Sequence, residues 1–474
     1  MMGSPAGKAS AAAYWVLAAL FAMNLLNYID RFILAAVLGP VQQSLGIEED
    51  DAAGGFLTTI FFISYAVFSP VMGWLGDRMT RKYLLTAGVA VWSLATFASG
   101  LVETYPQMLL ARSVLGIGEA SYAILAPTLI ADFFPRERRG RALALFYVAI
   151  PVGAALGYLL GGGIYTHHDR LTVLPLIERG LTAVTGQQFD EASRGWRMAF
   201  FVVGLPGLAV ALAALLLPEP RRGATEDVDE EQRARHEALP LSWPIYAALF
   251  RNRSYLYNLL AMAMLTFALG GLQVWTPKFL STGNGRPVLS LHDANLGLGI
   301  VVVVSGLVGT PLGAWLADRL ARNYRGAYFL MSGVSMLAAV PFILLALLAA
   351  LYGGGPVLIF GSILVGLTLA LLNYGPSNAI IVNVTAPRIR AAAFAVNTFF
   401  IHLLGDIPSP YLMGAVSDWA RAYTDTRQGL FWGLAITVPA MVISGIFFCL
   451  GRDHLEADQE AVLKAIRSSE LGAV

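Results

Sequence analysis

The sequence has very little of two things that soluble proteins normally contain, cysteine and charge. Its 474 residues include one cysteine, Cys449, which excludes an intramolecular disulfide framework. Only 13% of the residues are charged, against about 25% in a typical soluble domain, while 57% are hydrophobic. We therefore expect a chain that is embedded in a lipid bilayer.

Several motifs that carry chemistry are also missing. The sequence has no nucleotide-binding loop, no nucleophile elbow, no CxxC pair and no Cys/His cluster. We therefore expect no enzymatic activity, no cofactor, no bound metal and no nucleic-acid partner.

The apolar residues are collected in twelve runs that can cross a membrane. A bilayer core about 30 Å thick requires about 20 apolar residues in a helix. The runs are 14–38, 54–75, 84–102, 106–130, 141–163, 198–217, 255–280, 295–317, 327–351, 356–384, 392–416 and 430–450. These runs predict an all-α integral membrane protein with twelve transmembrane helices.

A charged stretch between the sixth and seventh runs is typical of a linker. It divides the chain into an N-terminal six-helix bundle (1–220), a cytoplasmic linker (221–254), a C-terminal six-helix bundle (255–451) and a cytoplasmic tail (452–474). The first run is too long for the apolar part of a signal peptide, so we expect it to stay in the protein.

The distribution of basic residues predicts the orientation. Arg78, Arg81 and Lys82 follow the second run, whereas the loop after the first run has acidic residues at 48–51 and no Lys or Arg. Because basic loops are retained in the cytoplasm, both termini are expected to be cytoplasmic, in a bacterial inner membrane.

The two halves of the chain repeat each other. Residues 74–81 read W-L-G-D-R-M-T-R, and residues 315–322 read W-L-A-D-R-L-A-R after the eighth run. A second pair, P-R-E-R at 135–138 and P-R-I-R at 387–390, follows the fourth and tenth runs. Such repeats indicate two pseudo-symmetric bundles.

These motifs resemble those of a known family. Residues 73–82, G-W-L-G-D-R-M-T-R-K, match the major facilitator signature G-x-x-x-D-R-x-x-R-[RK]. The stretches 27–31, 116–122, 126–132, 146–153 and 275–280 resemble the spinster branch of that superfamily. The resemblance implies a secondary transporter that works by alternating access and uses protons to move lysophospholipids or sphingoid phosphates.

Four ionisable residues inside apolar runs matter most. They are Asp30 and Arg31 in the first run and Arg112 and Glu119 in the fourth. Charges within a membrane are costly and usually mark a transport path, although these four could instead form a structural ion network. Arg112 and Glu119 are seven residues apart, which puts them on one helical stripe with Gly116 between them.

The resemblance assigns roles to these charges. It implies that Asp30 and Glu119 exchange protons, and that Arg31 and Arg112 pair with them or bind an anion. A low-dielectric site favours a protonated carboxyl group, and a neighbouring guanidinium favours the ionised form. Moving an arginine toward or away from a carboxyl group therefore changes the affinity of that group for protons. Asn27 belongs to the polar face of the first run.

The C-terminal half has a weaker polar character. Asn373 in the tenth run and His402 in the eleventh are candidate substrate contacts, and His402 is spaced to pair with Asp406 and anchor its helix. This asymmetry suits an amphipathic substrate whose anionic head lies near Arg31 or Arg112.

The repeated motif predicts a cytoplasmic gate. Its residues are Gly73, Asp77, Arg78, Arg81, Asp318, Arg319 and Arg322. Asp77 is suited to lie near the N-terminus of the eleventh helix, where the helix dipole favours an anion.

Two regions outside the predicted site carry further expectations. The region 165–196, with His167, His168 and Asp169, is expected to be a solvated outer loop, because no further ligand is spaced to complete a metal site. The glycines Gly153, Gly157 and Gly161 to Gly163 in the fifth run are expected to permit close helix packing.

Three identities remain open at this point. The favoured one is a monomeric lipid transporter whose partners are a lipid-like substrate, protons and the bilayer. The alternatives are a proton symporter for small organic anions such as sugar acids and a non-transporting membrane receptor.

Overall fold

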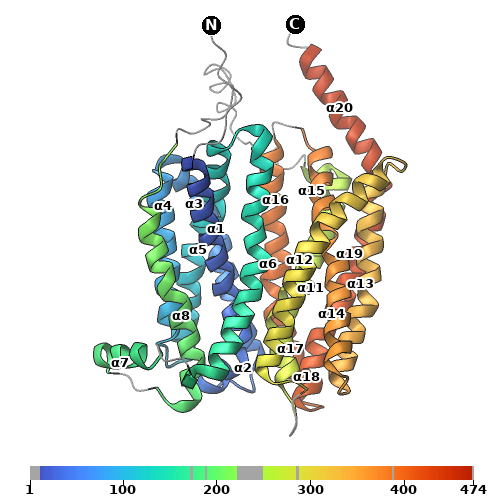
Figure 1. The fold of residues 1–474 in the computed structure, drawn as a ribbon. Coiled ribbons are helices and arrows are strands. Elements are labelled where there is room, and N and C mark those ends of the chain that lie inside the picture. Colours follow the sequence, from blue (N-terminus) through green and yellow to red (C-terminus); the bar gives the residue numbers. More distant parts are fainter. Residues whose placement is uncertain are drawn as a thin grey trace. The chain divides into compact units, whose positions relative to one another are not determined.

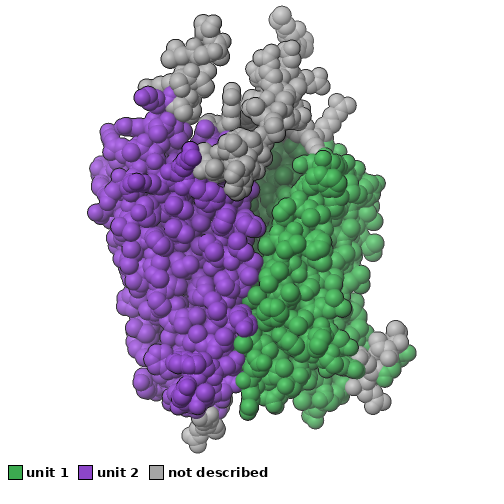
Figure 2. Space-filling model, turned by 180° about the vertical axis from the view of Figure 1, so that it is seen from behind, with its two compact units in different colours: residues 1–234, 290–299 green, residues 235–289, 300–474 purple. Residues whose placement is uncertain are grey.

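The computed structural model describes residues 11–170, 174–186, 189–220, 249–283, 288–386 and 389–471. In these residues the chain forms helices and no β-strand. It divides into two compact units (Figure 2). Unit 1 comprises residues 1–234 and 290–299, and unit 2 comprises residues 235–289 and 300–474.

Unit 1 is a bundle of long helices (Figure 1). Its helices are α1 (Ala11–Ala36), α2 (Leu38–Ser44), α3 (Asp51–Arg78), α4 (Arg81–Ser99), α5 (Tyr105–Phe133), α6 (Arg136–His167), α7 (Leu174–Thr185) and α8 (Glu191–Ala214). The closest helix pairs are α1 with α6, and α5 with both α3 and α4. Side chains cap the starts of α3 and α8. Asp50 accepts a hydrogen bond from the Ala53 amide (2.7 Å), and Asp190 accepts one from the Ser193 amide (3.2 Å).

Unit 2 contains several interrupted helices. Its helices are α11 (Arg253–Ser281), most of α12 (Leu291–Ala321), α13 (Ala327–Leu351), α14 (Pro356–Leu371), α15 (Tyr374–Asn383), α16 (Arg390–Ile401), the π-helical segment η3 (His402–Asp406), α17 (Pro408–Arg421), α18 (Thr426–Ala435), α19 (Thr437–Gly451) and α20 (Leu455–Leu471). The break between α14 and α15 has a local cause. Pro376 has no amide hydrogen to donate to the Leu372 carbonyl, and its ring crowds that carbonyl.

The predicted all-α membrane fold agrees with the helix lengths. Ten helical segments of the described residues are long and apolar enough to cross a membrane. Two further segments, α4 and the run formed by α16, η3 and α17, lie where the third and eleventh spans were predicted. The predicted linker 221–254 lies mostly outside the described residues, as do Pro387 and Arg388 of the second repeat.

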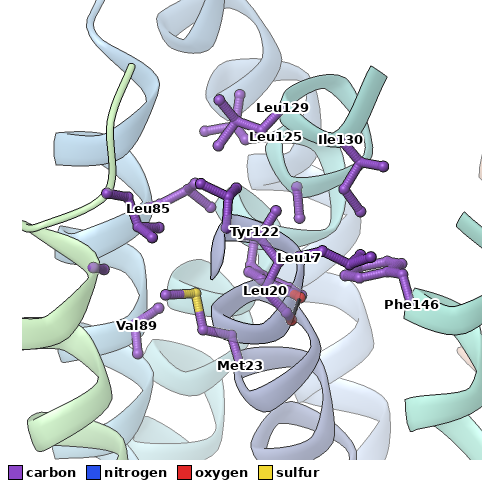
Figure 3. Close-up of a cluster of buried hydrophobic side chains, with 14 of the residues drawn as sticks. Leu17, Leu20, Met23, Leu85, Val89, Tyr122, Leu125, Leu129, Ile130 and Phe146 are labelled. Carbon is purple, nitrogen blue, oxygen red and sulfur yellow. Dashed lines mark hydrogen bonds between the residues drawn. The ribbon is translucent and has the colours of Figure 1, made fainter. Parts of the chain in front are cut away.

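The core of unit 1 contains apolar side chains from α1, α3, α4, α5, α6 and α8, and Figure 3 shows part of it. Leu17, Leu20 and Met23 of α1 pack among residues of α4, α5 and α6. Tyr122 of α5 places its hydroxyl in this core and donates to the Leu20 carbonyl (2.5 Å), which satisfies the buried phenol and ties α5 to α1.

Three of the predicted glycines of α6 allow α1 to approach closely, whereas the prediction is wrong for Gly163, where a Cβ would meet no atom within 4 Å. A Cβ at Gly153 would lie 2.7 Å from the Leu25 carbonyl oxygen, and one at Gly157 would lie 2.6 Å from the Phe32 Cβ. A Cβ at Gly161 would lie 2.5 Å from the Ala36 Cβ. Residues larger than glycine would therefore push α1 and α6 apart.

The connection 165–196, expected to be a solvated loop, contains helical segments. Residues up to His167 belong to α6, residues 168–170 form a 3₁₀ turn, and residues 174–185 form α7. With 12 residues, α7 is too short to span a bilayer, so the long apolar runs did not predict it.

Candidate functional site

The four predicted membrane charges lie in one buried cluster of unit 1. Asp30 and Arg31 come from α1, and Arg112 and Glu119 come from α5. Asp30, Arg112 and Glu119 are each at most 2% exposed. Because an isolated buried charge is very costly, each needs compensation from its surroundings.

Arg31 and Glu119 form the central ion pair of this cluster. The Arg31 Nε donates to Glu119 Oε2 over 2.7 Å, and the Arg31 side chain is 15% exposed. Asn27, one turn earlier on α1, lies beside the same carboxylate. The structure thus brings together Asn27, Arg31 and Glu119.

Aromatic rings surround the Arg31 guanidinium. Its central carbon lies 5.0 Å from the centre of the Tyr28 ring, 5.2 Å from Phe61 and 5.3 Å from Tyr65. The faces of aromatic rings attract cations, and the attraction is stronger where water is excluded. These rings therefore compensate a guanidinium that is largely removed from water.

Phe61 also contacts the second arginine. The Arg112 guanidinium carbon lies 5.4 Å from the centre of the Phe61 ring. Phe61 is 1% exposed, so it is a buried ring that two guanidinium groups share. It attracts both like-charged groups and holds them at defined distances from α3.

Asp30 and Arg112 have fewer direct partners. Arg112 interacts electrostatically with both Asp30 and Glu119, and Thr96 of α4 lies beside Asp30. Within the described residues, Asp30 Oδ1, Glu119 Oε1 and the Nε and Nη1 of Arg112 have no hydrogen-bond partner. An unsatisfied buried polar atom costs about 1–3 kcal/mol, so the cluster favours binding of further polar groups or protons.

Glycines bring α5 against its neighbours at the level of these charges. A Cβ at Gly116 would lie 2.4 Å from the Phe61 carbonyl oxygen of α3. A Cβ at Gly118 would lie 2.7 Å from the Trp92 amide of α4. Because Gly116 lacks a side chain, α5 lies close enough to α3 for Arg112 to reach Phe61.

In unit 2 the predicted polar residues lie at helix irregularities. Asn373 is fully buried at the break between α14 and α15, where its Nδ2 donates to the Ala370 carbonyl (2.9 Å). Its Oδ1 has no partner in the described part of the chain.

His402 and Asp406 pair as their spacing predicted. His402 Nδ1 lies 2.5 Å from Asp406 Oδ2 within the π-helical segment η3. The Ile407 amide donates to the His402 carbonyl (3.0 Å), which is the wide turn of a π-helix. Pro408 follows directly and cannot donate to the carbonyl of Leu404, which gives a local reason for the wide turn.

The predicted gate residues of the first repeat surround the connection from α3 to α4, called here the Arg81 end of unit 1. Gly73, Asp77 and Arg81 line a hollow of about 400 Å³ together with Asp132 of α5. Arg78 lies outside this hollow, with its guanidinium carbon 4.2 Å from the centre of the Trp74 ring. Asp77 is exposed.

Arg81 holds three segments of unit 1 together. Its Nη1 lies 2.6 Å from Asp132 Oδ2, and its Nε lies 2.9 Å from Glu219 Oε1. Glu219, beyond the end of α8, also accepts from the Lys82 amide (3.0 Å) at the start of α4. Arg81 is 4% exposed, so these are largely buried pairs.

The second repeat reproduces only part of this arrangement. The Arg319 guanidinium carbon lies 5.6 Å from the centre of the Trp315 ring, as Arg78 lies over Trp74. Asp318 accepts a hydrogen bond from the Tyr328 hydroxyl (3.0 Å). Arg322, the counterpart of Arg81, is exposed. The two repeats are therefore alike in sequence but differ in burial.

The second pair of repeats is offset by one residue from the predicted alignment. Arg139 donates to the Ala131 carbonyl (2.9 Å), and Arg390 makes the same contact with the Val382 carbonyl (3.1 Å). Because Arg139 and Arg390 each donate to the carbonyl eight residues earlier in the chain, Arg139 rather than Arg138 is the counterpart of Arg390.

Sequence reasoning did not identify several residues of these sites. Phe61 and Tyr65 were missed because aromatic residues are frequent throughout the chain, at 11%, and no pattern distinguishes these two. Asp132 and Glu219 were missed as partners of Arg81, because Glu219 is 138 residues away in the sequence.

Comparisons with known proteins agree with this architecture. The sequence profile of the Major Facilitator Superfamily matches residues 20–410. Protein spinster homolog 1 of Bos taurus is 34% identical, over 96% of this chain and 83% of that protein. The Mus musculus protein named sphingosine-1-phosphate transporter SPNS2 is 32% identical, over 90% of this chain and 74% of that protein.

Solved structures show the same fold. A bacterial homolog of the human lysosomal transporter Spinster, crystallised in an inward-facing and unoccupied conformation, matches with a TM-score of 0.78 and 23% identity, over 98% of this chain and 99% of the other. The D-xylose-proton symporter matches with a TM-score of 0.67 and 16% identity, over 92% of this chain and 97% of the other. The predicted fold of twelve transmembrane helices in two bundles is confirmed.

Proposed function

The chain belongs to the spinster branch of the major facilitator superfamily, and from this premise we propose that it couples proton movement to the transport of amphipathic lipids by alternating access. Its relatives are membrane transporters rather than enzymes, and one of them is named for a sphingoid phosphate. The proposed substrates are lysophospholipids or sphingoid phosphates, which share an anionic head and one acyl or alkyl chain.

The buried cluster of Asp30, Arg31, Arg112 and Glu119 carries this proposal. In a purely structural network, each buried polar atom would be expected to have a hydrogen-bond partner, because buried charges without such partners destabilise a fold. Asp30, Arg112 and Glu119 instead have polar atoms without partners in the described chain. Such a cluster is suited to bind a charged group and to exchange protons.

Glu119 and Asp30 are the proposed proton carriers. The ion pair with Arg31 favours the ionised form of the Glu119 carboxyl group. Protonation of Glu119 removes the charge that attracts Arg31, and an anion then competes better for the guanidinium. Proton binding and anion binding are linked in this way through a single arginine.

Arg112 is proposed, beside Arg31, as a ligand of the head group. Its Nε and Nη1 have no hydrogen-bond partner in the described residues, and a guanidinium binds phosphate oxygens through charge-assisted hydrogen bonds. Phe61 supports the position of Arg112 from α3. Asn27 of unit 1 and Asn373 and His402 of unit 2 are further proposed substrate contacts.

The proposed gate comprises Gly73, Asp77, Arg78 and Arg81 of the first repeat and Asp318, Arg319 and Arg322 of the second. The burial of Arg81 between Asp132 and Glu219 supports a role in fixing the ends of α4 and α5. We place the Arg81 end and both termini in the cytoplasm, and the protein as a monomer in a bacterial inner membrane.

A substrate panel in proteoliposomes tests this function. Under an imposed proton gradient, we expect uptake of lysophospholipids or sphingoid phosphates and no uptake of sugar acids. Among lysolipids, affinity should increase with chain length, since each buried methylene contributes about 0.8 kcal/mol. Uptake of a sugar acid without lipid uptake would support the organic-anion alternative. Binding of a lipid without its movement across the membrane would support a receptor.

A further inference from the structure

Helix α7 is a part of unit 1 that the proposed transport cycle does not use. It connects α6 and α8, which are both long and apolar enough to span a membrane. In Figure 1 it runs crosswise at the ends of these helices rather than along them. Because α6 ends at His167 and α8 begins at Glu191, α7 lies close to the boundary of the bilayer.

The residues of α7 separate into two sides. At 100° per residue, Leu176, Ile177 and Leu181 lie on one side, and Glu178 and Thr182 lie on the other. This separation is the pattern of an amphipathic helix. In a water-soluble protein the apolar side of such a helix would face the core.

The contacts of α7 show that its polar side faces the bundle. Glu178 Oε1 accepts from Arg194 Nε of α8 over 3.1 Å. The connection to α8 is fixed next to this ion pair, because Phe189 is buried against Phe201, with ring centres 5.8 Å apart, and lies under the Arg197 guanidinium. Leu176, on the apolar side, is 64% exposed.

We propose that α7 is an interfacial helix whose apolar side, formed by Leu176, Ile177 and Leu181, enters the lipid bilayer at its boundary with water. Its crosswise orientation, with the exposed Leu176 opposite Glu178 on the helix, is the geometry of a helix lying in the membrane surface, while Ile177 and Leu181 are half-buried. Arg170 and Arg179 are exposed and are placed to meet lipid phosphate groups.

The size of α7 favours lipid over a protein partner. A helix of 12 residues is about 18 Å long, at about 1.5 Å per residue. One side of such a helix covers much less than the roughly 800 Å² per partner of a stable protein interface. A bilayer requires no such minimum area, because it is already in contact with the neighbouring helices.

Single spin labels test this proposal in the full-length protein. Replacing Cys449 with serine gives a background without cysteine. A nitroxide is then attached to Leu176→Cys or Ile177→Cys on the apolar side, and to Thr182→Cys as the matched control on the polar side. Collision rates with oxygen, which is concentrated in lipid, and with a water-soluble nickel chelate are measured in liposomes.

We expect the ratio of oxygen to nickel collisions to be higher at positions 176 and 177 than at position 182. Equal ratios at all three positions would place α7 in water and overturn the proposal. Protection of positions 176 and 177 from both reagents would show that protein covers this side, which also overturns it. The outcome does not depend on whether the protein transports lipids.

Discussion

Replacing Phe61 with leucine should weaken the charged cluster much more than the loss of a buried ring alone would. The ring lies 5.2 Å from the Arg31 guanidinium carbon and 5.4 Å from that of Arg112, and it is 1% exposed. A desolvated cation–π contact is worth up to about 2 kcal/mol, so losing two costs about 2–4 kcal/mol beyond the change in volume. Leucine fills part of the space but offers no aromatic face.

A matched variant isolates this effect. Phe200 of α8 is fully buried and packs against Trp196 with ring centres 6.0 Å apart, so Phe200→Leu removes the same volume in the same unit. The free energy of unfolding is measured by titration with SDS in mixed micelles. Phe61→Leu should be the more destabilising of the two by about 2–4 kcal/mol.

A double-mutant cycle then assigns the difference to the arginines. Phe61→Leu and Arg112→Gln should show a coupling free energy of about 1–2 kcal/mol, whereas Phe200→Leu and Arg112→Gln should be additive to within about 0.5 kcal/mol. Equal destabilisation by the two phenylalanine variants, together with additivity in both cycles, would refute the role assigned to Phe61.

Three other changes probe separate parts of the structure. Arg81→Gln leaves Asp132 and Glu219 without their buried partner, so it should destabilise the protein by about 3–5 kcal/mol in the same SDS titration, while exposed Arg322→Gln should have little effect. Gly157→Val places a side chain against Phe32 and should cost about 1–3 kcal/mol, whereas Gly163→Val, where a Cβ would meet no atom within 4 Å, should be tolerated better. Arg112→Lys keeps the charge but loses the planar donors, so lysolipid binding measured by calorimetry should weaken, and unchanged affinity would count against head-group recognition by Arg112.

The sequence was sufficient to predict the charged residues and the helices that carry them. Asp30, Arg31, Arg112 and Glu119 stand out because ionisable residues are rare in apolar runs, and the seven-residue spacing of Arg112 and Glu119 predicted that they share a face. Their environment was not predictable in the same way. Phe61 matters because α3 packs on Gly116 of α5, and that contact depends on tertiary packing rather than on any local pattern.

The irregular helices show a similar limit. The eleventh run was predicted as one helix, yet it is divided by the π-helical segment at His402–Asp406. Pro408 and Pro410 signalled a distortion, but they did not specify whether the helix would kink, break or widen. The repeats likewise predicted a counterpart for Arg81 at Arg322, but its exposure depends on acidic partners that the repeated motif does not contain.

Proton movement driven by lipid is the most direct test of the proposed mechanism. The protein is reconstituted in liposomes that contain a pH-sensitive dye, and a lysophospholipid or sphingoid phosphate is added on one side. The parent protein and the exposed-carboxylate control Glu103→Gln should both show a lipid-dependent change in internal pH. Asp30→Asn and Glu119→Gln should bind the lipid and show no such change. Lipid-dependent proton movement of parental size in both buried variants, or none in the parent, would contradict the assignment of these carboxylates as the proton carriers.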